Sequence, residues 1–239
     1  MSIVTDSVFI KSVIDLTTLE GSDTPERVLQ LCTKAKQQHT AAVCVYPTFA
    51  RLVRQSLSGT HIKTACVAGA FPAGQSPIQI KIAEVAYAVQ EGAQEIDMVI
   101  SRGTFLTHDY NTVGEEIKAI KTACGAAHLK VILETGELQS PQNIRLASEI
   151  AIANGADFIK TSTGKIAVSA TPEAVQIMTD VIKQYYEQTG RQIGIKVAGG
   201  VSTIEEALRY IGIVQETVGD AWLNPSLFRI GASRLLDRL

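Results

Sequence analysis

The chain has 239 residues, of which 46% are hydrophobic and 19% charged, and its formal net charge at pH 7 is −2. This length and composition exclude a disordered chain and favour one folded domain over residues 1–239. The small net charge argues against a nucleic-acid partner, which would require a basic face. No apolar run in the sequence approaches the roughly 18 residues that a membrane helix needs, so we expect no membrane partner.

Short apolar runs alternate with longer amphipathic segments along the chain. The short runs are nearly continuous in Val, Ile, Leu and Ala, which is typical of parallel strands covered on both faces. The longer segments carry apolar residues at helical spacing, as in "IQIKIAEVAYAVQEG". The predicted strands cover residues 13–18, 41–47, 64–71, 95–100, 129–135, 158–163, 193–200 and 227–232.

Several predicted helices begin with a recognisable capping pattern. A hydroxyl side chain can accept from a free backbone amide, and a proline at the next position loses no hydrogen bond. "STIE" adds a predicted capping box of Ser202 and Glu205. The hydroxyl–proline pairs are Thr24-Pro25, Ser76-Pro77, Ser140-Pro141 and Thr171-Pro172.

Eight strand–helix units in one chain of this length predict an α/β protein with a (β/α)8 TIM barrel. The alternative is an open doubly wound sheet, which usually carries a glycine fingerprint after its first strand. Here the first predicted strand leads into "DLTTLEGSD", which contains no GxGxxG. The barrel is therefore the preferred fold, and no linker or change in composition suggests a second domain.

The cysteines and histidines indicate neither disulfides nor a metal site. Cys32, Cys44, Cys66 and Cys124 form no CxxC pair, so we interpret them as free thiols in a reducing, cytoplasmic environment. The four histidines show no HExxH or other ligand spacing. We therefore expect no metal.

Two lysines lie inside predicted central strands, Lys160 in "FIKTST" and Lys196 in "IGIKVAGG". They are either solvated at strand ends or turned into the barrel. If they face inward about 4 Å apart, their repulsion amounts to about 4 kcal/mol at an effective dielectric of 20, which lowers one pKa by roughly 3 units. That shift would supply the neutral amine needed to attack a carbonyl and form a Schiff base.

Asp15 in "VIDLTT" and Asp97 in "EIDMVI" each interrupt an apolar strand. A buried aspartate requires partners, and for Asp15 an ion pair with a lysine is as good an explanation as a catalytic role. "GAQEID" (92–97) and "GADFIK" (155–160) share a pattern that would place Asp97 and Lys160 at equivalent depths, both pointing inward. We therefore favour proton transfer for Asp97. Cys44 in "VCVYP" is predicted inside the barrel, mainly as core.

Glycines after the last strands suggest a phosphate site. "TGK" is not a P-loop, because Ile159 and Ile166 occupy positions where that motif needs Gly and Ser or Thr. Loops after strands seven and eight commonly bind phosphate in this fold through backbone amides. The candidates are Gly164, Gly199, Gly200 and Gly231, with Lys165 supplying charge and Ser233 a hydroxyl or amide.

Seven motifs in order over nearly the whole chain resemble the deoxyribose-phosphate aldolase family: "DLTTL", "VCVYP", "EIDMV", "ETGEL", "ADFIKTSTGK", "KVAGGV" and "FRIGAS". The resemblance implies a cofactor-independent class I aldolase that cleaves 2-deoxy-D-ribose 5-phosphate to D-glyceraldehyde 3-phosphate and acetaldehyde in deoxyribonucleoside catabolism. It also implies that Lys160 is the Schiff-base lysine, that Lys196 lowers its pKa, and that Asp97 belongs to the proton relay. Pocket residues would be Asp15, Thr17 and Cys44, and the phosphate end would comprise Gly164, Lys165, Gly199, Gly200 and Ser233.

The sequence departs from the family pattern at two places. Arg234 replaces a second serine found in some members after "GAS", which would alter one phosphate contact. Some members also carry a C-terminal tail ending in a tyrosine that assists proton transfer, whereas the last tyrosine here is Tyr210. The rival interpretations are a Schiff-base aldolase for another phosphorylated sugar and a non-catalytic barrel that binds a sugar phosphate. A homodimer would fit such a barrel.

Overall fold

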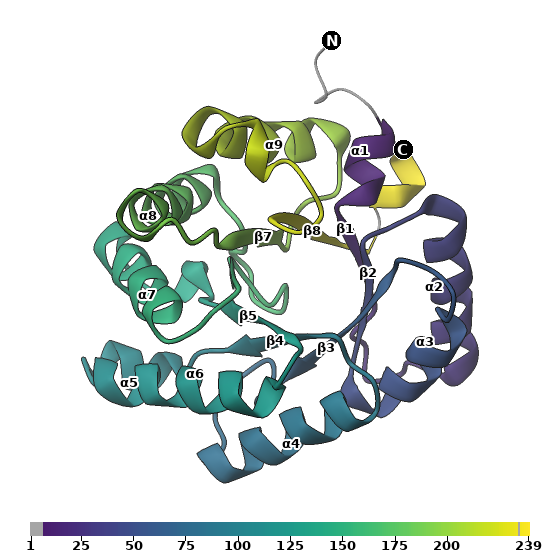
Figure 1. Ribbon diagram of the computed structural model, residues 1–239, viewed down its shortest axis with the longest axis horizontal. Helices are drawn as coiled ribbons and strands as arrows, with labels where there is room; N and C mark the ends of the chain where they lie inside the picture. Colours follow the sequence, from purple (N-terminus) through teal and green to yellow (C-terminus); the bar gives the residue numbers. More distant parts are fainter. Residues whose placement is uncertain (1–6, 234) are drawn as a thin grey trace.

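A computed structural model describes residues 7–233 and 235–239, and its centre is a closed barrel of eight parallel strands (Figure 1). Each strand pairs with its successor, and β8 pairs with β1 to complete the ring. All eight predicted strands and the predicted barrel are confirmed. Most observed strands end earlier than predicted, because the chain leaves the ladder to form the loops at the barrel mouth. The strands are β1 (Ile14–Thr17), β2 (Ala42–Val45), β3 (Lys63–Ala68), β4 (Glu95–Val99), β5 (His128–Ile132), β6 (Phe158–Lys160), β7 (Gly194–Ala198) and β8 (Phe228–Ala232).

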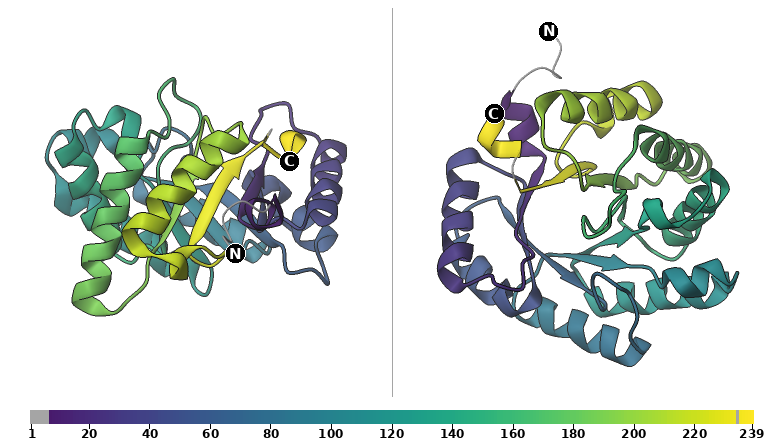
Figure 2. Two further views of the ribbon diagram at one scale, coloured as in Figure 1. Left: turned by 90° about the horizontal axis from the view of Figure 1, so that it is seen from above. Right: turned by 180° about the vertical axis from the view of Figure 1, so that it is seen from behind.

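A ring of helices surrounds the barrel, and the two further views show the same arrangement from above and from behind (Figure 2). Within the described part of the chain, no helix has the length and apolarity to cross a bilayer. The helices are α1 (Ser7–Ser12), α2 (Pro25–Gln38), α3 (Ala50–Ser56), α4 (Ile78–Gln90), α5 (Arg102–Leu106), α6 (Tyr110–Cys124), α7 (Pro141–Ala153), α8 (Pro172–Thr189) and α9 (Ile204–Val218), with short 3₁₀ turns η2 (Pro47–Phe49), η3 (Thr135–Glu137), η4 (Asp220–Trp222) and η5 (Leu235–Arg238).

The predicted helix caps are confirmed at Thr24, Ser140 and Thr171, whose side chains accept from the amide three residues later. The prediction for Ser76 was wrong, because α4 begins one residue later with Pro77 at the cap. The capping box of α9 is likewise shifted by one residue from the prediction, and its members are Thr203 and Glu206. Both helices therefore begin one residue later than predicted, and α4 has no side-chain cap.

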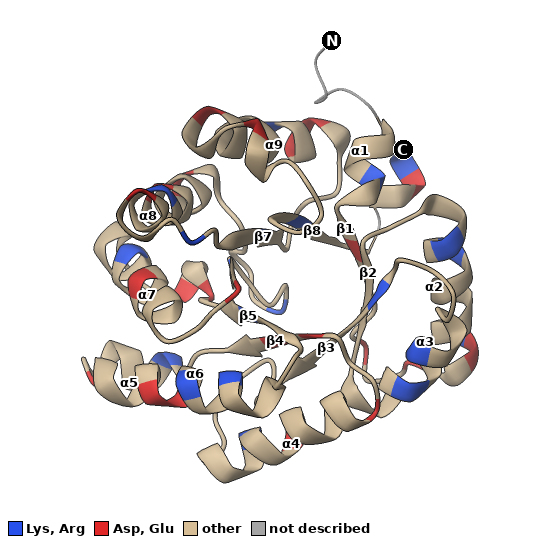
Figure 3. Ribbon diagram, viewed as in Figure 1, with Lys and Arg blue, Asp and Glu red and all other residues tan. Residues whose placement is uncertain are grey.

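The hydrophobic core has two parts. The larger part lies between the strands and the helices and includes fully buried residues such as Leu16, Ile96 and Ile195. A smaller cluster contains Leu19, Ala42, Cys44, Ala65 and Val67. Charged residues occur on the helices and also on the strands themselves (Figure 3). A strand residue points its side chain either into the barrel or toward the helices. Buried charged residues on the strands are therefore the first place to look for a functional site.

Candidate active site

Six of the eight strands carry charged side chains that meet inside the barrel, and none of these side chains belongs to a residue more than 4% exposed. The predicted residues Asp15, Asp97, Lys160 and Lys196 are brought together there. Three further members were not predicted. The complete cluster is Asp15 on β1, Glu95 and Asp97 on β4, Lys130 on β5, Lys160 on β6, Lys196 on β7 and Arg229 on β8.

Asp97 joins the two predicted lysines. Its Oδ2 atom accepts from Lys160 Nζ at 2.7 Å and from Lys196 Nζ at 2.8 Å. The inward orientation that the repeated sequence pattern predicted for Asp97 and Lys160 is therefore confirmed. Since both nitrogens contact one oxygen, they lie within about 5.5 Å of each other. This is close enough for strong repulsion if both were charged.

The two lysines have opposite electrostatic environments. Burial and the neighbouring Lys196 lower the pKa of Lys160 and outweigh the opposing attraction of Asp97. Burial would also lower the pKa of Lys196, but the carboxylates of Asp15 and Asp97 reverse that effect and raise it. Lys196 Nζ lies 2.5 Å from Asp15 Oδ2, whereas Lys160 has no comparable second carboxylate within the described residues. Lys160 is thus the amine that loses its proton more readily.

Asp97 itself is an ionised carboxylate. Burial would raise its pKa, but Lys130, Lys160 and Lys196 together hold the pKa well below its usual range. Asp15 behaves in the same way, since Lys196, Arg229 and Lys130 overcome the cost of its burial and lower its pKa. The ion pair considered for Asp15 is therefore present, with Lys196 as its lysine partner.

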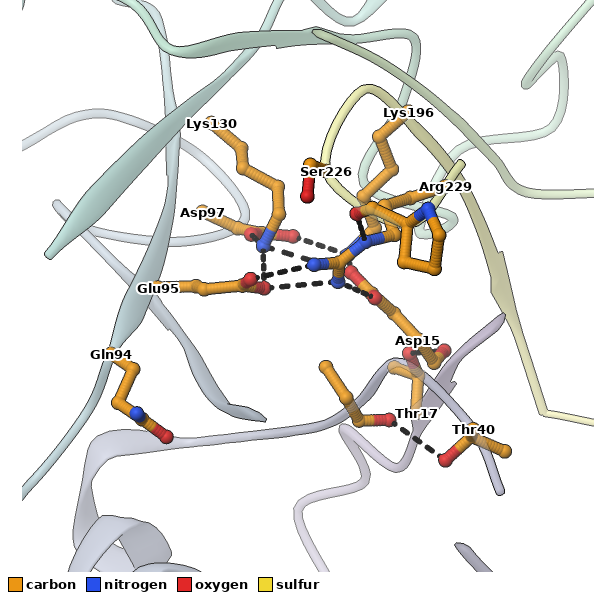
Figure 4. Close-up of polar contacts among 12 residues, drawn as sticks. Asp15, Thr17, Thr40, Gln94, Glu95, Asp97, Lys130, Lys196, Ser226 and Arg229 are labelled. Atoms are coloured by element: carbon orange, nitrogen blue, oxygen red, sulfur yellow. Dashed lines mark hydrogen bonds and ion pairs between the residues drawn. The ribbon is translucent and has the colours of Figure 1, made fainter. Parts of the chain in front are cut away.

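Glu95, Lys130 and Arg229 form the part of the cluster that was missed (Figure 4). Lys130 Nζ lies 2.5 Å from Glu95 Oε2 and 3.1 Å from Asp97 Oδ1. Arg229 bridges Asp15, at 2.5 Å, and Glu95, at 2.8 Å. The sequence holds a signal for each: Glu95 precedes Asp97 by two residues and so shares its face, while Lys130 interrupts the apolar "LKVIL" and Arg229 the apolar "LFRIGA".

Glycines create the space for this cluster. A Cβ atom at Gly231 would lie 3.2 Å from Lys196 Cε and 2.9 Å from Ala198 Cβ. A Cβ at Gly194 would lie 2.3 Å from the Phe158 ring, so Gly194 makes room for that ring rather than for Lys196. The ring centroid of Phe158 is 5.9 Å from Lys130 Nζ and 5.8 Å from the Arg229 guanidinium carbon. The aromatic face thereby supports the two cations next to it.

The smaller apolar cluster, most of which lies on β2 and β3, gives the barrel interior an uncharged side. Cys44 belongs to it, and the partly buried rings of Tyr46 and Phe71 pack against it in an edge-to-face arrangement with centroids 6.2 Å apart. Burial raises the pKa of the Cys44 thiol to about 11, so the thiol stays protonated at neutral pH. Thr17, at the end of β1, donates its hydroxyl to the Asp15 carbonyl at 2.8 Å. The charged cluster thus faces an uncharged one across the barrel.

We expect the native protein to be inert to thiol reagents. All four cysteines are free and buried, and burial raises the thiol pKa at each of them. An aromatic disulfide reagent at pH 8 should release almost no thiolate from the folded protein and should titrate four thiols in denaturant. Rapid modification of Cys44 in the folded state would contradict this description of its environment.

The loops after β6 and β7 meet at the barrel mouth. Gly164 and Gly199 have positive φ angles of 77° and 82°, and a Cβ at Gly199 would lie 3.3 Å from the Gly164 Cα. Gly200 also has a φ of 82°, with open space where its Cβ would be. The predicted glycines are therefore adjacent, and their left-handed backbone favours glycine at each position.

The other predicted phosphate residues lie at the surface. Lys165 Nζ forms an ion pair with Glu20 at 3.1 Å, which links the loop after β6 to the loop after β1. Ser233 is exposed just after β8. The predicted change of contact at Arg234 falls outside the described residues. Tyr210, the last tyrosine, is buried in α9 and donates to the Ala170 carbonyl at 3.1 Å.

A second buried hydrogen-bond network stabilises the loop after β6 at the barrel mouth. Glu134 has a φ of 57° and a fully buried side chain, which accepts from Arg102 at 3.1 Å and from the Thr163 amide at 3.1 Å. The Thr163 hydroxyl in turn accepts from the Lys165 amide at 3.0 Å. These contacts fix the chain between Lys160 and Lys165, directly after the candidate nucleophile.

Comparison with known proteins agrees with this architecture. The model of the family described as DeoC/LacD family aldolase matches residues 9–233. The chain belongs to this aldolase family. The deoxyribose-phosphate aldolase of Homo sapiens is 44% identical over 242 residues, which cover 94% of this chain and 76% of that protein. The deoxyribose-phosphate aldolase of Agrobacterium fabrum is 44% identical over 230 residues, which cover 95% of this chain and 87% of that protein.

A solved structure shows the same fold. The deoxyribose phosphate aldolase of Aeropyrum pernix, described as a tetramer, superposes with a TM-score of 0.80 at 26% identity, covering 97% of this chain and 89% of that one. The resemblance first drawn from seven short motifs is therefore confirmed at the level of the family. The DeoC/LacD aldolase fold places the charged cluster of this chain at the centre of its barrel.

Proposed function

We propose that this aldolase reversibly cleaves 2-deoxy-D-ribose 5-phosphate to D-glyceraldehyde 3-phosphate and acetaldehyde through a Schiff base on Lys160. The observation that carries the proposal is the shared Asp97 oxygen. It places a lysine with a lowered pKa beside a lysine with a raised pKa inside a closed barrel. A neighbouring ammonium favours the neutral form of the amine, which is the form that attacks a carbonyl to make an imine.

Imine formation would begin with attack of the neutral Lys160 amine on the C1 aldehyde carbon. The carbinolamine that results loses its hydroxyl as water, and the nitrogen becomes a protonated imine. The proton that leaves with the hydroxyl comes from the network of Lys196 and Asp97, whose groups lie within 2.8 Å of one another. The positive imine nitrogen is then the electron sink for carbon–carbon cleavage.

Cleavage would break the bond between C2 and C3. The C3 hydroxyl loses its proton, its oxygen becomes the aldehyde of glyceraldehyde 3-phosphate, and the bonding electrons pass through C2 into the imine. The resulting enamine is protonated at C2, for which Lys196 and Asp97 are the candidate relay. Hydrolysis of the second imine releases acetaldehyde and regenerates Lys160. All of these steps use amines, carboxylates and water, so we propose that no cofactor is needed.

The barrel interior has a charged side and an apolar side, which suit different parts of this substrate. The two carbons that become acetaldehyde carry no polar group besides the imine, and the apolar side of the barrel around Cys44 matches them. At the mouth, Gly164, Gly199, Gly200 and Ser233 would hold the phosphate through backbone amides and a hydroxyl, with Lys165 supplying charge. Asp15 and Thr17 would lie between these two regions.

Lys165 should affect binding of the phosphorylated substrate and little else. A charge-assisted hydrogen bond contributes about 1.5–3 kcal/mol, so Lys165→Ala should raise KM for 2-deoxyribose 5-phosphate roughly tenfold to a hundredfold. The rate at which acetaldehyde alone forms an imine should stay at the wild-type value. Lys183→Ala, which removes an exposed lysine from α8, is the matched control. An unchanged KM in Lys165→Ala would remove this residue from the phosphate site.

The proposed activity is tested by product analysis. Purified protein treated with EDTA should convert 2-deoxyribose 5-phosphate into equal amounts of acetaldehyde and glyceraldehyde 3-phosphate, and should run in reverse with both aldehydes. A panel of phosphorylated aldehyde acceptors distinguishes this reaction from that of another Schiff-base aldolase. Phosphate-dependent thermal stabilisation without any product would instead support a non-catalytic sugar-phosphate barrel.

We also propose a domain organisation, a set of partners, a compartment and an assembly for this protein. We propose that residues 1–239 act as one catalytic domain with small-molecule sugar phosphates and aldehydes as partners. The four buried free thiols fit a reducing cytoplasm, and the activity would serve deoxyribonucleoside breakdown. A homodimer remains our expectation for the assembly, and sedimentation at micromolar concentration tests it.

A further inference from the structure

We propose that Lys130 is a positioning residue that keeps Lys160 uncharged, because Lys130 neutralises Asp97 from the side opposite the nucleophile. The inference rests on the proposed role of Lys160. Lys130 is fully buried on β5 and does not contact the Lys160 amine through any hydrogen bond within the described residues. Its effect would pass through the carboxylate that the two lysines share.

The contacts of Asp97 are divided between its two oxygens. Lys130 Nζ donates to Oδ1 at 3.1 Å, whereas Lys160 and Lys196 donate to Oδ2 at 2.7 and 2.8 Å. Lys130 also lies 2.5 Å from Glu95 and 3.6 Å from Asp15, so it touches every carboxylate of the cluster. Within the described residues, Lys160 forms an ion pair with Asp97 alone.

The charges of the cluster balance only without a proton on Lys160. Three carboxylates, Asp15, Glu95 and Asp97, face Lys130, Lys196 and Arg229. A charged Lys160 would leave one surplus positive charge in an interior shielded from water, which is costly. The carboxylates raise the pKa of Lys130, Lys196 and Arg229 against the opposing effect of burial.

The groups that face the cluster from the remaining elements do not change this balance. Cys44 on β2 faces the interior, and burial raises the pKa of its thiol, so it stays neutral. On β3 the inward side chains are the uncharged Ala65 and Val67, while Cys66 lies in the larger core between strands and helices. Glu134, after β5, is already paired with Arg102 at 3.1 Å. Every strand of the barrel is thereby accounted for, and Lys130 is the cation that compensates Asp97 from the β5 side.

The position of Lys130 predicts shifts of opposite sign for two variants. Lys130→Met removes a positive charge from the other oxygen of the Asp97 carboxylate, no more than about 8 Å from the Lys160 nitrogen, so the pKa of Lys160 should rise by roughly one to two units. Glu95→Gln removes a negative charge and should lower the pKa of Lys160 by about one unit. The double variant restores the balance and should titrate close to wild type. A purely structural role would move both single variants in the same direction.

The experiment is competitive trace labelling with acetic anhydride from pH 6 to 11, with the Lys160 peptide quantified by mass spectrometry. Labelling of the amine does not depend on aldolase activity, so it tests this inference separately from the proposed function. The proposed function is tested by imine trapping in the wild-type protein. At pH 7 we expect labelling of Lys160 to fall about 10–100-fold in Lys130→Met and to rise in Glu95→Gln.

The matched control is Lys81→Met. Lys81 is a fully buried lysine on α4 that donates to Ser101 at 2.7 Å and Glu116 at 3.1 Å, outside the barrel cluster. Its loss should lower the melting temperature and leave the Lys160 titration unchanged. Equal Lys160 titrations in wild type, Lys130→Met and Glu95→Gln would overturn the inference, as would shifts of the same sign in the two single variants.

Discussion

Replacing Lys160 with methionine should reduce turnover of 2-deoxyribose 5-phosphate by about 10⁴-fold or more, because loss of a covalent nucleophile leaves only the contribution of binding and positioning. The fold should survive, since the three carboxylates keep Lys130, Lys196 and Arg229 as partners. The variant should also keep its affinity for the sugar phosphate. Steady-state assays with a thermal-shift titration measure both properties.

Lys160→Arg is the control for this prediction. Arginine keeps the length and the hydrogen bond to Asp97 but stays protonated, so it should be as inactive as methionine. Turnover above about one tenth of the wild-type rate in either variant would show that another group forms the covalent bond or that none forms.

Replacing Lys196 with methionine should move the activity profile toward alkaline pH by roughly two units. Two ammonium groups about 5 Å apart repel each other by about 3 kcal/mol at an effective dielectric of 20, which corresponds to roughly two pKa units. Without Lys196 the protonated form of Lys160 is less disfavoured, so its pKa rises. At pH 7 activity should fall about a hundredfold, and part of the loss should be recovered near pH 9.

The pH profile separates this effect from a structural one. Lys196→Arg keeps the positive charge beside Asp15 and Asp97 and should keep the wild-type profile, although its bulk near Gly231 would lower the rate. A uniform loss of activity at every pH in Lys196→Met would contradict the assigned role. The part of the activity that stays lost at high pH after the shift would measure the proton-transfer role proposed for Lys196.

Much of the fold follows from the sequence because parallel barrel strands are apolar on both faces. Eight such runs defined eight strands, and a charge inside such a run, as at Asp97 or Lys196, signalled an interior site. The strand ends were harder to place. "TSTGK" continues the composition of β6, but side chains take over its hydrogen bonds: the Thr161 hydroxyl donates to the Ala198 carbonyl at the end of β7, and the Thr163 amide donates to the Glu134 carboxylate.

The sequence did not predict that three further charged residues, Lys130, Glu95 and Arg229, point into the barrel. Glu95 is the first residue of its strand and Arg229 the second, and charges near the start of a strand are usually exposed flanks. Their inward direction depends on the register around the whole barrel, which sets Lys130 beside Asp97 and Arg229 beside Lys196. No local pattern encodes that register, because it is determined by closure of the barrel.

The arrangement of the proposed phosphate end follows only in part from the sequence. The left-handed backbone at Gly164 and Gly199 explains why glycine stands at these two positions, and the two loops meet there. The ion pair of Lys165 with Glu20 was not foreseen, since the two residues are far apart in the chain and meet only because the loops after β1 and β6 converge. For Lys165 to bind phosphate, this surface ion pair must open, which costs little.

The proposed mechanism requires Lys160 to form a covalent imine with the aldehyde. Incubation with acetaldehyde followed by borohydride reduction, with peptide mass spectrometry, tests it directly. We expect a single ethyl group on Lys160, no label on Lys130, Lys165 or Lys196, and loss of activity in proportion to the label. Complete activity after reduction, or an ethyl group on another lysine with Lys160 unmodified, would contradict it.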